Sequence, residues 1–340
     1  MKTRIYTKID YLNSLIANIQ ATKPGDTILL ATMDFDVQFP VYDQLLSALT
    51  EAAQRSVNVT FIVDAYKFLN GPILPPKARV KRHKNLQWLT LLKEAGVQVT
   101  ICNQPILPLS FPFMGRSHLK CCIINDVAYL GGCNLDNPSL LDSMLEIHSR
   151  ELADWLFAQF MLIVHSGSTQ KAFRGKDITL TLSSGDKIII DAGRRNQSSI
   201  LEAAHALIDA ANDYVWAACY YFPGGNTGFH LKKAVLRKCN VMLYYSNPKA
   251  HKNFGSVQRL YVWTQRLKLP SELFRGQLRP DAPMLHAKML SSGHLAMIGS
   301  HNYVWQGVKF GTTEIAFVTQ SPEIIKQIEN SIHELVAPYR

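Results

Sequence analysis

The chain has 340 residues, a formal net charge of +10 and 47% hydrophobic residues. This composition excludes a disordered chain, and the length suggests two domains or one duplicated architecture. The apolar runs fall short of the roughly 20 residues that a spanning helix needs, and the amino end lacks the apolar core of a signal peptide. We expect a cytoplasmic protein, peripheral on the inner membrane face, with an anionic partner.

The cysteines argue against a structural metal site. They show neither a CxxC pair nor another zinc-ligand spacing, and most lie in apolar, strand-like sequence where a free thiol behaves as a small hydrophobe. This usage fits a reducing compartment. The six residues are Cys102, Cys121, Cys122, Cys133, Cys219 and Cys239.

The first half of the chain begins with an amphipathic helical segment and an apolar β-type run at 26–35. The segment 49–64 then predicts the end of a helix, a basic turn and a strand. The Pro-rich, basic stretch 70–85 predicts an exposed loop. An apolar strand starting at His118, a glycine turn and a closing helix at 149–165 complete this half.

The second half repeats this order. A β-hairpin at 178–193 leads into an apolar run at 213–222 and a helix–turn–strand segment at 231–246. A strand starting at His286 and a closing helix at 321–336 follow. Strands alternating with helices predict an α/β fold with mixed sheets flanked by helices. We place the two lobes at 1–168 and 169–340.

Two segments repeat polar residues at one constant offset. His118 and Lys120 match His286 and Lys288, and each pair lies 168 residues apart. The same offset relates further residues after the HxK motifs. These are Gly131 and Gly299, Asn134 and Asn302, and Glu146 and Glu314. A single HxK indicates little, but a duplicated scaffold has no structural reason to keep five polar or turn positions together, so we interpret the repeat as catalytic.

The repeated residues suit a phosphate group. In a strand, His118 and Lys120 point to one face while Leu119 points to the core. Imidazole, ammonium and the amide of Asn134 together can bind and attack an oxyanion. If the lobes pack about a pseudo-twofold axis, two histidines face one phosphodiester, one as nucleophile and the other as acid and base.

The supporting residues of this predicted site are the two lysines, the two asparagines and the two glutamates. Glu146 and Glu314 would orient the imidazoles, although the spacing leaves open which glutamate serves which histidine. The mechanism requires no metal and no cofactor. A phosphate-binding module without turnover is the alternative, and it would be expected to lose a histidine or lysine from one lobe.

These motifs resemble the phospholipase D superfamily, whose signature runs HxK, Asp and then Gly-Ser-x-Asn. The segments AAQRSVNVTFIVD and DYVWAACYYFPG resemble cardiolipin synthases in particular. The resemblance implies two phospholipase D-like lobes with one active site between them and ping-pong phosphatidyl transfer. It further implies that His118 is the nucleophile and His286 the acid and base. Ser300 matches the family serine, whose first-lobe counterpart is Gly132.

One family residue is missing. The aspartate that follows the lysine by five positions is Asn125 in the first lobe and Gly293 in the second, and Asp126 lies one residue late. Tyrosyl-DNA phosphodiesterases also lack this aspartate, which keeps a nucleic-acid substrate as an alternative. The membrane anchor that many cardiolipin synthases carry is also missing.

Two stretches bear on the substrate. The predicted loop carries a dense basic cluster that would attract an anionic surface, or would simply be solvated. The cluster consists of Lys77, Arg79, Lys81, Arg82 and Lys84. The apolar stretch 105–114 would cross the core, line an acyl-chain groove or dip into the membrane interface. We predict a cardiolipin synthase-like phosphatidyltransferase acting on an anionic, phosphatidylglycerol-like lipid, with a phospholipase D-type hydrolase or a nuclease as alternatives and no obligatory protein partner.

Overall fold

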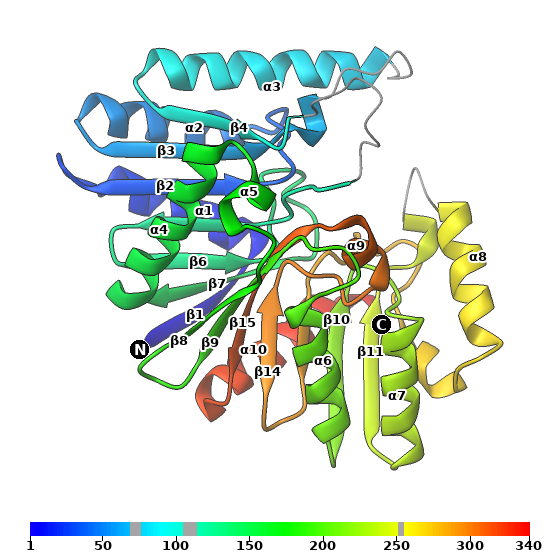
Figure 1. Ribbon diagram of the computed structural model, residues 1–340. Coiled ribbons are helices and arrows are strands. Elements are labelled where there is room, and N and C mark those ends of the chain that lie inside the picture. Colours follow the sequence, from blue (N-terminus) through cyan, green and yellow to red (C-terminus); the bar gives the residue numbers. More distant parts are fainter. Residues whose placement is uncertain (69–75, 105–113, 251–254) are drawn as a thin grey trace.

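The computed structural model describes residues 1–68, 76–104, 114–250 and 255–340. Two mixed β-sheets lie side by side in it, with helices on both faces of each (Figure 1). The two sheets are built from separate stretches of the chain. The first uses residues between 2 and 148, and the second uses residues between 178 and 319.

The first sheet has seven strands in the order β1-β7-β6-β5-β2-β3-β4. β2, β3 and β4 are parallel to one another, and the remaining neighbours are antiparallel. The strands are β1 (Lys2–Thr7), β2 (Thr27–Thr32), β3 (Asn58–Asp64), β4 (Gln98–Cys102), β5 (Cys121–Ile124), β6 (Val127–Gly131) and β7 (Ser143–His148).

The second sheet has the order β12-β11-β10-β13-β14-β15-β9-β8. Apart from β8, it repeats the first sheet strand for strand, which confirms the duplicated α/β fold that the sequence predicts. The strands are β8 (Ile178–Thr181), β9 (Lys187–Ala192), β10 (Tyr214–Cys219), β11 (Asn240–Tyr245), β12 (Gly276–Gln277), β13 (Met289–Ser291), β14 (Ala296–Gly299) and β15 (Thr313–Thr319).

Three hydrophobic clusters hold the helices to the sheets. One buries α1 (Lys8–Gln20), α2 (Val41–Gln54) and α3 (Pro76–Glu94) on the outer face of the first sheet. Another buries α6 (Ser199–Ala210), α7 (Asn226–Leu236) and α8 (Gly255–Arg266) against the second. The third joins the lobes through α4 (Arg150–Ser166), α5 (Thr169–Phe173) and α10 (Pro322–Val336). The short α9 (Trp305–Phe310) precedes β15.

The closing helices end each lobe as predicted, and their starts follow from local chemistry. Ser149 caps α4 by accepting a hydrogen bond from the backbone N–H of Leu152, and Gly167 ends the helix with a left-handed backbone. Pro322 occupies the first turn of α10, where its missing N–H costs nothing. The described cysteines are all buried free thiols.

The loop predicted over 70–85 is wrong for most of its length. Pro76 to Glu94 form α3, so Lys77, Arg79, Lys81, Arg82 and Lys84 lie on a helix. Pro76 is the first residue of this helix and does not break it, because proline is tolerated in a first turn. Residues 69–75 and almost all of the apolar stretch 105–114 lie outside the described residues. Within the described part of the chain, no helix is long and apolar enough to span a bilayer.

Candidate active site

Each lobe pairs a short stretch of backbone with the other lobe, directly beside an HxK motif. Ser117 forms a parallel bridge with Thr313, and Leu285 forms the equivalent bridge with Leu141. The N–H of His118 donates to the carbonyl of Thr313 at 2.8 Å, and that of His286 donates to the carbonyl of Leu141 at 2.7 Å. The two bridges are related as a pseudo-twofold axis requires, and they place each histidine near the start of the other lobe's last strand.

Both histidines are paired with a carboxylate across the lobe boundary. Nδ1 of His118 lies 2.8 Å from Oε2 of Glu314, and Nδ1 of His286 lies 2.6 Å from Oδ2 of Asp142. A carboxylate that accepts the Nδ1 proton fixes the tautomer in which Nε2 carries a lone pair. Each imidazole is therefore held as a nucleophile or base with Nε2 free to face a substrate.

The prediction for Glu146 is wrong. This carboxylate accepts from Nε2 of His148 at 3.0 Å and makes no contact with either HxK histidine. The cause is a change of offset: Gly131 and Gly299 differ by 168, but their sheet partners Met144 and Ala316 differ by 172. Helix α9 lengthens the connection in the second lobe, and Asp142 is the true counterpart of Glu314.

The two lobes hold their carboxylates differently. In the second lobe, Ser300 donates from its hydroxyl to Oε2 of Glu314 at 2.5 Å. In the first lobe, Gly132 takes the place of that serine, and a Cβ there would lie 2.1 Å from Oδ1 of Asp142. Because aspartate is one carbon shorter than glutamate, Asp142 occupies the space that the serine side chain fills in the other lobe.

The two HxK lysines are buried beside the histidines. Nζ of Lys120 donates to the carbonyl of His118 at 2.8 Å. Nζ of Lys288 donates to the carbonyl of His286 and lies 2.9 Å from Nδ1 of the same residue. The ring of Tyr220 packs edge-on against His286, with centroids 4.9 Å apart. When protonated, these two buried lysines favour binding of an anion.

Burial and mutual charge shift the pKa values in this site. Burial, helped by Lys288, lowers the pKa of His286 to about 3, and burial lowers the pKa of His118 against the opposing effect of Glu314. Burial also lowers the pKa of Lys120 to about 7. Both imidazoles are therefore neutral at pH 7. A bound phosphodiester anion would raise the pKa of these groups, because a nearby negative charge favours their charged forms.

The carboxylates stay ionised despite their burial. Burial opposes ionisation of Asp142, but Lys288 and His286 together hold its pKa at about 2. Burial likewise opposes ionisation of Glu314, and its hydrogen-bonded neighbour His118 contributes most to holding that pKa at about 2. Each carboxylate can thus stabilise its histidine when the ring becomes protonated during a reaction.

The asparagines lie beside the same strands but in different contacts. Oδ1 of Asn134 accepts from the backbone N–H of Asp34 at 3.3 Å. Oδ1 of Asn302 is buried and has no hydrogen-bond partner within the described ranges. Its neighbour His301 is a site residue that the motif comparison did not select. Nδ1 of His301 accepts from the N–H of Tyr303, while its buried Nε2 has no partner among the described residues.

Each HxK motif is also anchored from the strand next to it. Asp64, at the end of β3, accepts from the N–H of Ser117 at 2.7 Å and pairs with Arg116 at 3.2 Å. Ser246, its counterpart after β11, donates to the carbonyl of Leu285 at 2.8 Å. Both anchors hold the residue directly before a histidine. The predicted helix–turn–strand repeats include both positions, although their role was not recognised.

The residues in place of the family aspartate lie away from the histidines. Asn125 has a positive φ of 52° in the turn between β5 and β6, at the opposite end of β5 from Lys120. Gly293, with φ of 78°, lies in the corresponding turn between β13 and β14. These tight turns explain why the stretch from the lysine to the glycine turn is short in both lobes.

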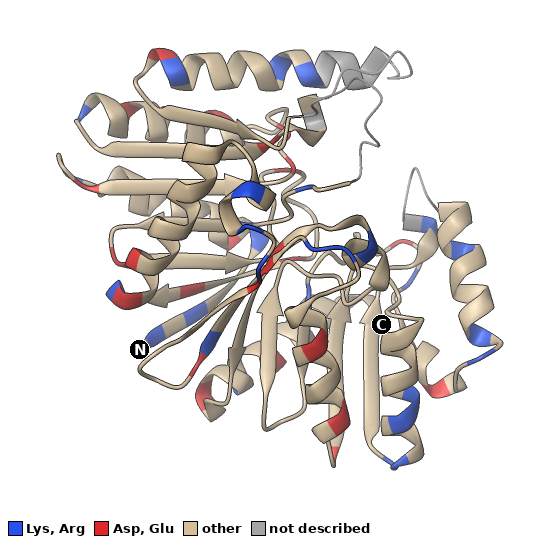
Figure 2. Ribbon diagram, in the orientation of Figure 1, with Lys and Arg blue, Asp and Glu red and all other residues tan. Residues whose placement is uncertain are grey.

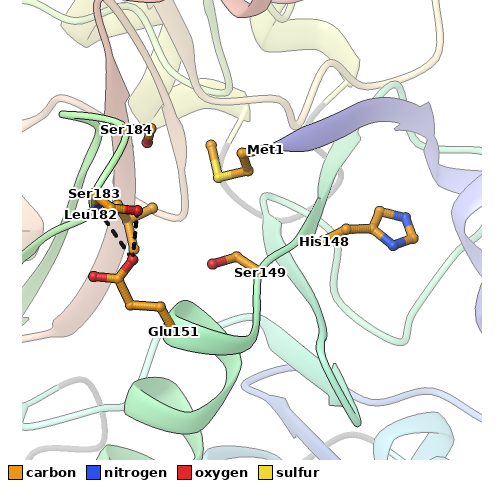
Figure 3. A pocket seen from close by; sticks show the side chains of 7 residues that line it. All are labelled: Met1, His148, Ser149, Glu151, Leu182, Ser183 and Ser184. Carbon is orange, nitrogen blue, oxygen red and sulfur yellow. Dashed lines mark hydrogen bonds between the residues drawn. The ribbon is translucent and has the colours of Figure 1, made fainter.

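A solvent-facing pocket at the start of α4 is separate from this site. Figure 3 shows its lining, in which the N–H and hydroxyl of Ser183 both donate to Oε2 of Glu151, at 3.2 and 3.1 Å. The pocket is formed by Met1, His148, Ser149, Glu151, Leu182, Ser183 and Ser184. It contains neither an HxK residue nor a carboxylate paired with one, so we do not assign the chemistry to it.

Comparison with known proteins identifies the family. A family profile described as "Cardiolipin synthase, PLD-like domain" matches residues 15–163 and 205–336, which is most of the chain. The protein belongs to the phospholipase D superfamily. No curated protein sequence gives a significant match. As a member of this family the protein is an enzyme, and the paired HxK sites described above are the positions at which the family signature falls.

Solved structures give the same fold at low sequence identity. Phosphatidylserine synthase from Haemophilus influenzae Rd KW20 has a TM-score of 0.76 and 11% identity, over 99% of this chain and 87% of that one. Polyphosphate kinase from Porphyromonas gingivalis has a TM-score of 0.61 and 14% identity, over 98% of this chain and 50% of the other. At these identities the likeness supports the bilobed architecture alone.

Proposed function

We propose that this phospholipase D-like enzyme transfers a phosphatidyl group from an anionic phospholipid to an alcohol, through a phosphohistidine intermediate. The observation that carries the proposal is the pair of histidine–carboxylate contacts across the lobes, at 2.8 Å for His118 and 2.6 Å for His286. Two buried lysines beside two such histidines suit a phosphodiester whose non-bridging oxygens share one negative charge.

In the first step, Nε2 of His118 attacks phosphorus and the bond from phosphorus to the leaving oxygen breaks. Protonated His286 gives its proton to that oxygen, so the leaving alcohol departs neutral. Glu314 stabilises the positive charge that develops on the His118 ring. Lys120 and Lys288 offset the charge on the phosphoryl oxygens.

In the second step, the acceptor alcohol gives its proton to His286 and attacks phosphorus, and the bond from phosphorus to Nε2 of His118 breaks. Two phosphatidylglycerol molecules would in this way yield cardiolipin and glycerol. Water in place of the alcohol would give phosphatidic acid. Exclusion of water from the buried site favours transfer over hydrolysis.

The test is the lipid mass spectrum of phosphatidylglycerol vesicles after incubation with the enzyme, with His118→Ala and His286→Ala as controls. Cardiolipin formed by the unmutated enzyme alone would support the transferase, and phosphatidic acid alone would replace it with a hydrolase. An unchanged spectrum would sink the lipid proposal and direct the search to nucleic-acid phosphodiesters. Incubation with phosphatidylglycerol labelled with ³²P at its phosphate would assign the nucleophile. Radiolabel bound to the protein that is labile in acid and stable in base indicates phosphohistidine, and it should remain in His286→Ala and be absent in His118→Ala.

A further inference from the structure

Helix α8 has apolar residues on two opposite faces. Its inner face packs on the second lobe, where Oε1 of Gln265 accepts from the N–H of Gly225 at 3.0 Å and Val262 is buried. On the outer side, four apolar side chains are more than half exposed. They are Val257 (62%), Leu260 (61%), Trp263 (57%) and Leu267 (68%), and we call them the α8 face.

The spacing of these residues makes one continuous stripe. Residues three or four apart lie on the same side of a helix, and 257, 260 and 263 follow this rule within α8. Leu267 continues the spacing in the turn directly after Arg266. A helix of a folded domain normally exposes polar residues opposite its packing face. A contiguous apolar stripe there indicates a surface that another phase or molecule covers.

The sequence that contains α8 is exclusively basic over a long stretch. Between Asp213 and Glu272 the chain contains no acidic residue, and Figure 2 shows Lys and Arg on α7 and α8 without an acidic neighbour on either helix. The nine basic residues of this stretch are Lys232, Lys233, Arg237, Lys238, Lys249, Lys252, Arg259, Arg266 and Lys268.

The α8 face also begins at the edge of the sheet where the histidines lie. The helix starts beside Pro248, just after β11, while Ser246 at the end of the same strand holds the residue before His286. Its Tyr261 hydrogen-bonds to Gln306, next to Trp305, which is itself 40% exposed. The amino-terminal end of the α8 face thus lies near the catalytic edge of the second lobe, and the exposed Trp305 lies on the neighbouring α9.

We propose that the α8 face docks the enzyme on the interface of a bilayer that contains anionic lipid. A helix with Trp and Leu on one side and Lys and Arg beside them is suited to the boundary between head groups and acyl chains. Nucleic acid would use the charges but would leave the aliphatic stripe exposed to water. The inference rests on the proposed function in one respect, since docking serves catalysis only if the substrate of the histidines is a phospholipid of that bilayer.

Vesicle co-sedimentation of the full chain tests the docking. All variants carry His118→Ala, which removes the proposed nucleophile, so that turnover does not change the lipid composition during the measurement. Binding to vesicles of phosphatidylcholine with phosphatidylglycerol should exceed binding to phosphatidylcholine alone. In that background Leu260→Glu should weaken partitioning by about tenfold or more, because it removes an inserted side chain and adds a repelled charge. Leu162→Glu on α4 is the matched control, since Leu162 is 45% exposed, and it should bind as the background does.

The outcomes separate docking from catalysis. Absence of vesicle binding, equal binding by Leu260→Glu, or equal losses in both glutamate variants would each overturn the α8 face as a docking surface. Binding of an RNA oligonucleotide in preference to the vesicles, lost in Leu260→Glu, would replace the bilayer by nucleic acid. Turnover of short-chain phosphatidylglycerol below its micelle concentration needs no docking, so Leu260→Glu made in the enzyme with His118 intact should retain it. Vesicle binding without any turnover would leave docking intact and remove the proposed function.

Discussion

The carboxylate of Asp142 fills the space in which a side chain at Gly132 would lie, with Oδ1 only 2.1 Å from the position of that Cβ. The second lobe solves the same problem with Ser300 and Glu314, whose side chains hydrogen-bond to each other. The backbone is alike in both lobes, since the N–H of Gly132 donates to Ser143 and that of Ser300 to Ile315, at 3.0 and 2.9 Å. The pair Gly132 and Asp142 in the first lobe and the pair Ser300 and Glu314 in the second therefore occupy the same volume at equivalent positions.

We expect Gly132→Ser to lower kcat/KM by about a hundredfold, because displacing Asp142 by an ångström misplaces the imidazole of His286. Adding Asp142→Glu should restore at least about tenfold of this loss, since the double variant copies the second lobe. Steady-state kinetics on dissolved short-chain lipid would measure both. A double variant no better than Gly132→Ser would contradict the equivalence of the two pairs.

The carboxylate assignment gives a direct comparison of two residues that lie four positions apart. Asp142→Asn should lower kcat by about a hundredfold or more, because the amide cannot stabilise a protonated His286. Glu146→Gln should change kcat little, as its carboxylate contacts His148 instead. Circular dichroism of both variants would control for folding. Comparable losses in the two would return Glu146 to the site.

The pH dependence of kcat/KM should be bell-shaped, with its maximum on the acid side of neutrality. The lowered pKa of His118 places the acid limb below the ordinary histidine range, because only a neutral His118 ring can attack phosphorus. As pH rises through the pKa of Lys120, about 7, the site loses a positive charge and binds phosphate less well. We assign the alkaline limb to this lysine, because the bound phosphodiester raises the pKa of His286 and so favours its protonated form.

Lys120→Arg checks that assignment, since arginine stays charged across the accessible range. The variant should be slower overall but should lose the alkaline limb when kcat/KM is followed from acid to alkaline pH. An alkaline limb that is unchanged in Lys120→Arg would assign it to another group. Dissolved substrate keeps any pH effect on a lipid surface out of the measurement.

The anchor before His118 should matter for stability as well as for rate. Asp64→Asn leaves Arg116 buried without a carboxylate, which costs about 3–5 kcal/mol of unfolding free energy for a broken buried pair. Asp281→Asn is the matched control. Its ion pair with Arg279 at 3.5 Å is exposed, so a change within about 1 kcal/mol is expected. Urea denaturation followed by circular dichroism would distinguish them, and equal midpoints would contradict the role of Asp64.

The sequence was sufficient for the duplicated fold, because apolar periodicity and repeated motifs record strands and helices directly. It was also sufficient for both HxK motifs. The sequence indicated the wrong carboxylate because the offset of 168 between the lobes ends at the glycine turn. Beyond it, the register of β6 with β7 and of β14 with β15 makes Asp142, and not Glu146, equivalent to Glu314. Asp142 could not be found by matching residue types, because the first lobe has aspartate and Gly132 where the second lobe has Glu314 and Ser300.

Other misses have equally local causes. The basic stretch before Asn85 was interpreted as a loop from its prolines, although its lysines and arginines are good helix formers and a proline can start a helix. His301 falls at the unspecified position of the family signature, so no motif could select it. Only its buried, unpartnered Nε2 reveals it within the described part of the chain.

The two parallel bridges, Ser117 with Thr313 and Leu141 with Leu285, make each half-site depend on the folding of the other lobe. When one lobe opens, the histidine of the lobe that stays folded loses both its carboxylate partner and its backbone hydrogen bond. We therefore expect activity to appear only when both lobes have folded, late in maturation of the chain. The arrangement also guards against a partly folded molecule that could form the phosphoryl adduct and release it to water.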